Sequence, residues 1–190
     1  MNKVDRTRSR IIDCAYELFM ASSYEAVRIV DIAKAANIST ATFYNHFGTK
    51  ENLLIALYVQ KTEITEEDYQ RIISQPTAWE RLRCLHRIYA EKMICIGKNL
   101  CTHLMTINTE LANLSKPRFP LIETLIEQAQ AEGSILSHDA AATLTVCCSY
   151  MMKGLYFYWC YSGDEFHIEH EARRSLETLY NVAPALRIQD

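Results

Sequence analysis

Apolar residues recur along this chain at the spacing of α-helices. Over residues 5–22, Ile11, Ala15 and Leu18 follow one another at i, i+4 and i+7, with Ile12 and Phe19 on the same stripe. No stretch alternates apolar and polar residues between hairpin turns, and Gly and Pro together number only nine. The pattern predicts an all-α protein of about nine helices.

Two short helices are predicted after the first, over residues 28–36 and 40–47. Asn37 suits the end of the first because asparagine tolerates a positive φ, and Ser39 is placed to cap the second. After Gly48, Thr49 caps a further helix that is expected to run over residues 49–70. Two short helices joined by a tight turn and held by longer ones are typical of a helix-turn-helix. We expect a three-helix DNA-binding domain over residues 1–48 and a C-terminal helical domain over 49–190.

The predicted helix over residues 40–47 has the composition of a helix that enters the major groove. Phe43 and Phe47, four residues apart, form its buried face. Its small, hydroxyl-bearing start allows close approach to base edges, and its exposed polar side chains can donate to phosphate oxygens. A lysine beside the positive end of the following helix also favours a phosphate there. The predicted DNA contacts are Arg28, Ser39, Thr40, Ala41, Thr42, Tyr44, Asn45, His46 and Lys50.

The charge distribution agrees with this prediction although the net charge does not. The net charge is −3, but residues 1–61 carry 8 Lys and Arg against 6 Asp and Glu, and the rest carries 12 against 17. Arg6, Arg8 and Arg10 cluster at the start of the basic part. Such a cluster is usually a solvated face, but on a DNA-binding module each arginine is a candidate phosphate contact.

The C-terminal two thirds predicts a helical domain that binds a small effector. Helices are expected over residues 79–97, 98–114 and 121–132, with a corner around Phe119 between Pro117 and Pro120. Apolar and aromatic residues on these helices predict a pocket for a medium-sized, largely apolar molecule with few charges. Plain core packing is the alternative for many of them. The candidate pocket residues are Tyr89, Met93, His103, Met105, Phe119, Tyr150, Met151 and Tyr158.

The last two predicted helices, residues 139–163 and 166–183, indicate a homodimer. The first of them is the most apolar stretch of the chain, and only Asp139 and Lys153 interrupt it with charge. A helix that is apolar nearly all round has to be buried on several sides. We expect these two helices of each protomer to form a four-helix bundle around a two-fold axis.

Other function classes find little support. The chain contains no Cys-x-x-Cys pair, no His-Glu-x-x-His and no Gly-rich phosphate loop, so we expect no metal, no cofactor and no enzyme activity. Seven cysteines, an odd number, are expected to be reduced, and a thiol sensor at Cys147 and Cys148 is the alternative. No apolar run is long enough for a membrane span and no signal peptide is apparent, which predicts a cytoplasmic protein. A helical small-molecule-binding or enzymatic protein without DNA contact remains the second hypothesis.

Three segments carry a family resemblance: "RSRIIDCAYELF", "VDIAKAANIS" and "TATFYNHFGTKENLL". Together, over about residues 8–57, they resemble the DNA-binding domain of the tetracycline-repressor (TetR) family of bacterial transcriptional regulators. The resemblance implies a two-fold symmetric homodimer on a pseudo-palindromic double-stranded operator, with a small-molecule effector that releases the repressor. The family usually has glycine near Ser23 and threonine at the positions of Val27 and Arg28. Arg28 could contact a phosphate through its charge, but the threonine cap of the second helix would be lost.

Overall fold

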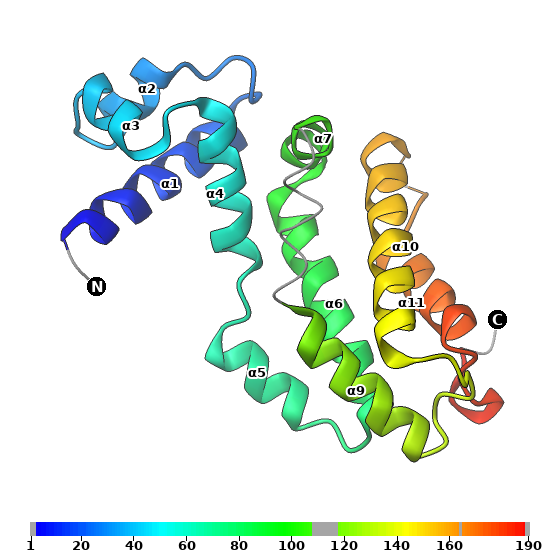
Figure 1. Ribbon diagram of the computed structural model, residues 1–190. Coiled ribbons are helices and arrows are strands. Elements are labelled where there is room, and N and C mark those ends of the chain that lie inside the picture. The colour runs from blue at the N-terminus through cyan, green and yellow to red at the C-terminus, as the bar shows by residue number, and fades with distance from the viewer. Residues whose placement is uncertain (1–2, 108–117, 164, 189–190) are drawn as a thin grey trace.

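The computed structural model describes residues 3–107, 118–163 and 165–188, which fold into helices packed on one another (Figure 1). These residues contain no strand, only an isolated bridge between Ile135 and Val182. The all-α prediction is therefore confirmed. The helices are α1 Lys3–Ala21, α2 Ile29–Ala35, α3 Thr40–Phe47, α4 Lys50–Thr62, α5 Glu66–Ile73, α6 Ala78–Ile96, α7 Lys98–Thr106, α9 Phe119–Ala131, α10 Ala141–Tyr161, α11 Ile168–Leu179 and the 3-10 helix η2 Pro184–Leu186.

The first three helices form a small domain at one end of the molecule. Figure 1 shows α1 passing beneath the α2–α3 pair, with α4 leading away from it. The predicted apolar stripe of α1 is buried here, since Ile11 and Ala15 are fully inaccessible, and Phe43 of α3 is equally buried. These residues belong to one core in which α3 packs on α2 and α4, and burial of Phe43 in it fixes which face of α3 remains outside.

The prediction of a single helix over residues 49–70 is wrong. α4 ends at Thr62, Glu63 has an extended backbone, and α5 begins after Thr65. Thr65 and Asp68 form a capping box: the Thr65 hydroxyl accepts from the Asp68 amide at 3.1 Å, and the Asp68 carboxylate accepts from the Thr65 amide at 3.0 Å. Such a box satisfies the free amides of a new helix start, so the chain turns instead of continuing.

The C-terminal part is organised around α6. This helix buries eleven of its residues, among them Trp79, Leu82 and Leu85. α9 and α7 pack on it, and α10 packs against both α7 and α9, with α11 on its other side (Figure 1). α7 ends at Thr106, so the rest of the helix predicted over residues 98–114 lies outside the described residues beyond Ile107. None of the described helices is long and apolar enough to cross a membrane.

Specific polar contacts join the N-terminal domain to α6 and α7. The Tyr16 hydroxyl donates to the Cys95 carbonyl at 2.8 Å, and the Tyr24 amide donates to Asn99 Oδ1 at 3.2 Å. His103 stacks on the Tyr24 ring, with its Nε2 2.6 Å from a carboxylate oxygen of Glu25. The two parts of the chain are therefore held by α4 and by this second set of contacts.

Candidate functional site

The turn between α2 and α3 has the geometry that its sequence predicts. Asn37 adopts φ of +49°, and the amide of Ile38 donates back to the Ala33 carbonyl at 2.9 Å. Ser39 caps α3, because its hydroxyl accepts from the Thr42 amide at 3.0 Å. A left-handed residue followed at once by a capped helix start gives the short turn of a helix-turn-helix.

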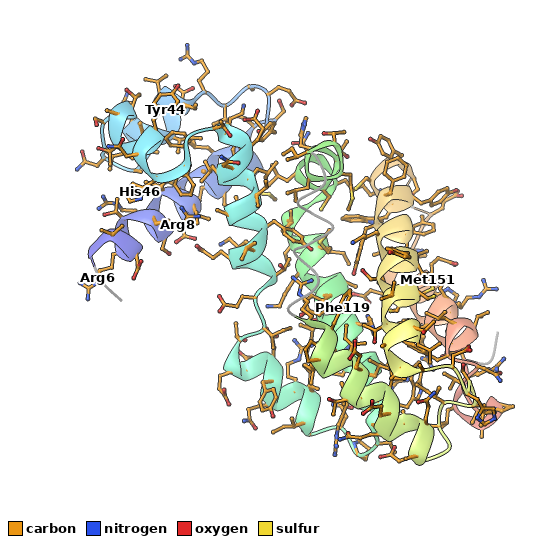
Figure 2. All side chains as sticks on the ribbon, viewed as in Figure 1. Arg6, Arg8, Tyr44, His46, Phe119 and Met151 are labelled. Atoms are coloured by element: carbon orange, nitrogen blue, oxygen red, sulfur yellow. The ribbon has the colours of Figure 1, made fainter. Side chains whose placement is uncertain are left out.

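The outer face of α3 is polar, small and accessible. Phe43 and Phe47 point into the core, whereas Tyr44 is 53% exposed. Thr40, Ala41 and Asn45 are also exposed, and Thr42 is half-buried, with its hydroxyl 2.9 Å from that of Ser39. Figure 2 places Arg6, Arg8, Tyr44 and His46 along the edge of the domain away from α6 and α10. The predicted groove residues therefore share one surface with the basic start of α1.

Arg28 precedes α2 at the N-cap position and keeps part of a helix cap. Its backbone amide donates to the Asp31 carboxylate at 3.0 Å, and its guanidinium donates to the same carboxylate through Nε at 3.1 Å. Hydrogen bonds from Arg28 lower the pKa of Asp31. The loss of the usual threonine is thus partly offset by Asp31, and the exposed guanidinium would have to share this carboxylate with any phosphate.

Lys50 has a structural role that the sequence did not reveal. Its ammonium donates to the carbonyls of Tyr24 and Val27, at 2.7 and 2.9 Å, and lies 4.1 Å from the centroid of the Tyr24 ring. The side chain therefore turns away from the N-terminus of its own helix and ties α4 to the segment between α1 and α2. These two carbonyls already stabilise the ammonium, so its place beside the positive end of a helix no longer requires a phosphate contact.

Arg8 likewise joins two helices of the domain. Its guanidinium donates to the His46 carbonyl at 3.0 Å and stacks over the Phe47 ring at 4.5 Å. This contact caps the C-terminal end of α3 and holds α3 on α1. Arg6 and Arg10 lie on the same helix and are exposed.

A cavity of about 330 Å³ lies within the C-terminal part, between α4, α6, α7, α9 and α10. Its volume is near the lower end of the ~300–1,000 Å³ of small-molecule sites. The wall is mostly apolar and aromatic, with a few polar side chains. The lining residues are Tyr58, Thr62, His86, Tyr89, Met93, Leu104, Met105, Ile107, Arg118, Phe119, Ile122, Thr145, Cys148, Ser149, Met152, Lys153 and Tyr156.

Half of the predicted pocket residues line this cavity, namely Tyr89, Met93, Met105 and Phe119. The other four lie elsewhere. His103 contacts Glu25 at the junction with the N-terminal domain, and Tyr150 and Tyr158 are exposed on α10. Met151 lies on α10 (Figure 2) and is half-buried, but it does not line the cavity. Its neighbour Met152 does. On α10 the cavity is therefore lined by a different face from the one predicted, because a helix that is apolar nearly all round has no distinctive stripe.

The polar groups of the cavity escaped the sequence analysis. His86 is buried, with Nε2 3.6 Å from Cys148 Sγ, and burial lowers its pKa to about 4, so the ring is neutral at pH 7. Burial raises the pKa of Tyr89 to about 12. The guanidinium of Arg118 stacks over that ring at 4.2 Å and donates to Thr62 Oγ1 at 2.8 Å. The only sequence signal for Arg118 was its place in the Pro117–Pro120 corner.

Neither a metal nor a redox function gains support at the predicted cysteines. In the part of the chain that the structure describes, no group of three or more His, Cys, Asp or Glu could hold a metal ion. Burial raises the pKa of Cys148 to about 11, which disfavours the reactive thiolate. Its neighbour Cys147 is exposed.

Taken together, the capped turn, the exposed start of α3 and the basic start of α1 define a helix-turn-helix DNA-binding domain. Residues 11–57 match the family described as "Bacterial regulatory proteins, tetR family". Residues 11–57 are thus similar to the DNA-binding domain of the TetR family, as the sequence resemblance implied.

Comparisons with individual proteins extend this likeness beyond the N-terminal domain. The chain is 29% identical to the transposon Tn10 TetC protein of Escherichia coli over 50% of its length, and the match spans 48% of that relative. It is 24% identical to the transcriptional regulator AcrR of Shigella flexneri, with 97% of this chain and 94% of AcrR aligned. Its fold is similar to that of Thermus thermophilus FadR, a TetR-family repressor in complex with lauroyl-CoA (TM-score 0.71, 20% identity, 96% of each chain).

Proposed function

We propose that the protein is a ligand-responsive transcriptional regulator, a repressor that leaves its operator when a small, largely apolar effector binds. The observation that carries this proposal is the exposed, small and hydroxyl-bearing face of α3, held by the buried Phe43 and Phe47. Helices of this kind enter the major groove with their N-terminal residues toward the bases. The relatives are regulators and not enzymes, which supports a non-enzymatic, cytoplasmic role.

The DNA contacts proposed from the sequence differ in how directly they can be tested. Tyr44 is the best position, because its ring is exposed and its hydroxyl has no structural task among the hydrogen bonds of the described residues. Lys50 is a poor one, because removal of its ammonium would also free two backbone carbonyls. Ser39 and Thr42 are coupled through the cap of α3, so their replacement would disturb the helix as well as the contact.

The experiment is a gel-shift titration with the promoter next to the protein's own gene. Tyr44→Phe should weaken operator binding roughly 3- to 10-fold, the value of one hydrogen bond of ~1 kcal/mol. Tyr69→Phe is the matched control, since Tyr69 is similarly exposed but lies on α5, away from the N-terminal domain. No sequence-specific shift with the unmodified protein would count against a regulator, and equal affinities of the two variants would remove Tyr44 from the interface.

The proposed homodimer joins protomers through α10 and α11. α10 leaves a row of large apolar side chains on the surface, namely Val146, Tyr150, Phe157, Tyr158 and Tyr161. Contiguous exposed apolar residues on one helix favour a protein partner. A homodimer would place two copies of α3 in successive major grooves, ~34–36 Å apart on a pseudo-palindromic operator. Sedimentation of the unmodified protein against Phe157→Asp tests this: a dimer should become a monomer.

The proposed effector site is the cavity between α4 and α10. Its apolar wall suits the apolar molecule expected from the sequence, and the structural relative FadR of T. thermophilus is described in complex with an acyl-CoA. α4 supports coupling to DNA, because Thr62 near its end lines the cavity and Lys50 at its start holds the N-terminal domain. A ligand that favours a different tilt of α4 would change the separation of the two α3 helices and lower operator affinity.

A further inference from the structure

The charge of one lining residue of the cavity points to the ligand's chemistry. Arg118 is among the lining residues, and within the described parts of the chain no Asp or Glu lines the cavity. His86 adds no charge because its ring is neutral at pH 7. A mostly apolar cavity with a guanidinium in its wall, and no acidic side chain among its described lining residues, is complementary to an apolar molecule with a negative group.

Arg118 is the cation whose surroundings are best defined. It is half-buried just before α9, and its guanidinium is held by the Thr62 hydroxyl and the Tyr89 ring. No carboxylate of the described residues lies within ion-pairing distance of it. Buried or half-buried arginines are commonly paired with an anion, and the planar guanidinium matches a carboxylate through two parallel hydrogen bonds.

Two buried hydroxyls in the same wall give a second, independent indication of a ligand. Thr145 Oγ1 and the Tyr156 hydroxyl have no hydrogen-bond partner among the described residues, and the two residues are only 1% and 8% exposed. Buried polar atoms are nearly always hydrogen-bonded in native proteins. Both residues line the cavity, but they lie eleven residues apart on α10, roughly 16 Å along the helix, so one polar group of a guest can satisfy only one of them.

We propose that the cavity binds a carboxylic acid with an apolar tail, and that its carboxylate takes the place of Thr62 as the partner of Arg118. The tail lies against the apolar wall formed by residues such as Met93, Phe119 and Met152. The carboxylate displaces a neutral hydroxyl from the guanidinium, and a charge-assisted pair is the stronger of the two. This proposal names the chemical class of the effector. The effect of the ligand on DNA binding rests on the proposed regulatory function, whereas binding of the ligand to the cavity does not.

The exchange of hydrogen-bond partners at Arg118 also connects ligand binding to the DNA-binding domain through α4. Thr62 is the last residue of α4, and its hydroxyl also donates to the Tyr58 carbonyl, which closes the last turn of the helix. The Arg118–Thr62 hydrogen bond therefore holds the end of α4 to the start of α9. A carboxylate bound to Arg118 breaks this hydrogen bond, while Lys50 keeps the other end of α4 attached to the N-terminal domain.

The test is calorimetric titration of the full chain, without DNA, with decanoate and with decan-1-ol. The two probes share an apolar tail and differ in the charged head. Decanoate should bind roughly 10- to 100-fold more tightly than the alcohol, the range expected for a hydrogen bond to a charged group. Arg118→Gln should abolish this preference and leave the affinity for the alcohol unchanged. Arg10→Gln, an exposed arginine on α1, is the matched control and should behave as the unmodified protein.

A second variant tests the exchange itself. Thr62→Val keeps the shape of the side chain but removes the competing acceptor, so decanoate should bind severalfold more tightly and decan-1-ol as before. Equal affinity for acid and alcohol, a preference that survives Arg118→Gln, or absence of binding by both probes would overturn the proposal. Unchanged decanoate affinity in Thr62→Val would overturn the exchange. Because no DNA is present, these results are independent of the operator gel shift.

Discussion

The DNA-binding domain and the effector cavity are built in opposite ways. In the N-terminal domain the decisive contacts join residues close in sequence, such as the Ser39 hydroxyl and the Thr42 amide, and the side chains proposed to meet DNA project outward. The cavity draws its wall from five helices between Tyr58 and Tyr156, and it leaves two buried hydroxyls without a partner in the described residues. A surface that contacts a duplex of constant shape can therefore be specified by residues close together in sequence, whereas a pocket depends on how distant helices pack.

The largest effect should come from Phe43, which is fully buried at the centre of the N-terminal domain. Phe43→Ala should lower the free energy of unfolding of this domain by ~3–5 kcal/mol, because the lost ring leaves a cavity. Phe119→Ala is the matched change in the effector region, where the ring is half-buried beside an existing cavity. We expect it to cost less than half as much in urea unfolding followed by circular dichroism. Equal losses would contradict the contrast between a close-packed domain and a hollow one.

A second prediction concerns pH and the buried His86. Burial lowers its pKa from 6.5 to about 4, so the unfolded chain binds a proton below pH 6.5 that the folded chain does not take up until about pH 4. Stability should therefore be full above pH 6.5 and fall as the pH decreases toward 4, by up to ~3 kcal/mol. His86→Leu should flatten this dependence. The readout is the slope of unfolding free energy against pH, which does not depend on the variant's absolute stability.

How far the sequence predicts the fold can be judged from α3 and α5. The start of α3 was predictable because Ser39, Phe43 and Phe47 specify a cap and a buried face within nine residues. The break before α5 was missed although Thr65 and Asp68 carry a capping-box signature, because the polar and apolar pattern continues through it. Arg118 and Thr62 could not be found by periodicity at all. They lie 56 residues apart, and only the packing of α9 near the end of α4 brings them together.

A third prediction concerns the start of α5, which the sequence analysis did not predict. The Asp68 carboxylate accepts from Thr65 and lies 2.7 Å from Lys92 Nζ, so it links α5 to α6. Burial by itself raises the pKa of Asp68, but the hydrogen bonds from Lys92 and Thr65 outweigh it, and the net pKa is lowered. Asp68→Asn should lower the free energy of unfolding by ~1.5–3 kcal/mol at pH 7, the value of hydrogen bonds to a charged group.

The sign of the pH dependence distinguishes Asp68 from His86. Because the folded pKa of Asp68 is depressed, its contribution is present above the unfolded pKa of 3.8 and is lost as the pH falls through the lower folded value. The difference between the unmodified protein and Asp68→Asn should therefore be constant from pH 8 to about 5 and shrink below pH 4. A difference that already declines between pH 6.5 and 5 would mean that Asp68 is not the group that titrates.

The smallest expected effect concerns the proposed DNA-binding surface. Arg6 is exposed on α1, along the same edge as Tyr44 and His46 (Figure 2). Unlike Arg8, it has no hydrogen bond or ion pair in the described structure, so its removal should leave the fold unchanged. If Arg6 neutralises one phosphate, Arg6→Gln should reduce the slope of log affinity against log salt by ~0.9 while sequence preference stays the same. Arg87→Gln, an exposed arginine on α6, is the control and should keep the full slope, because α6 lies outside the proposed interface. An equal slope for Arg6→Gln and Arg87→Gln would restrict the interface to α2 and α3 and leave the start of α1 as a solvated face.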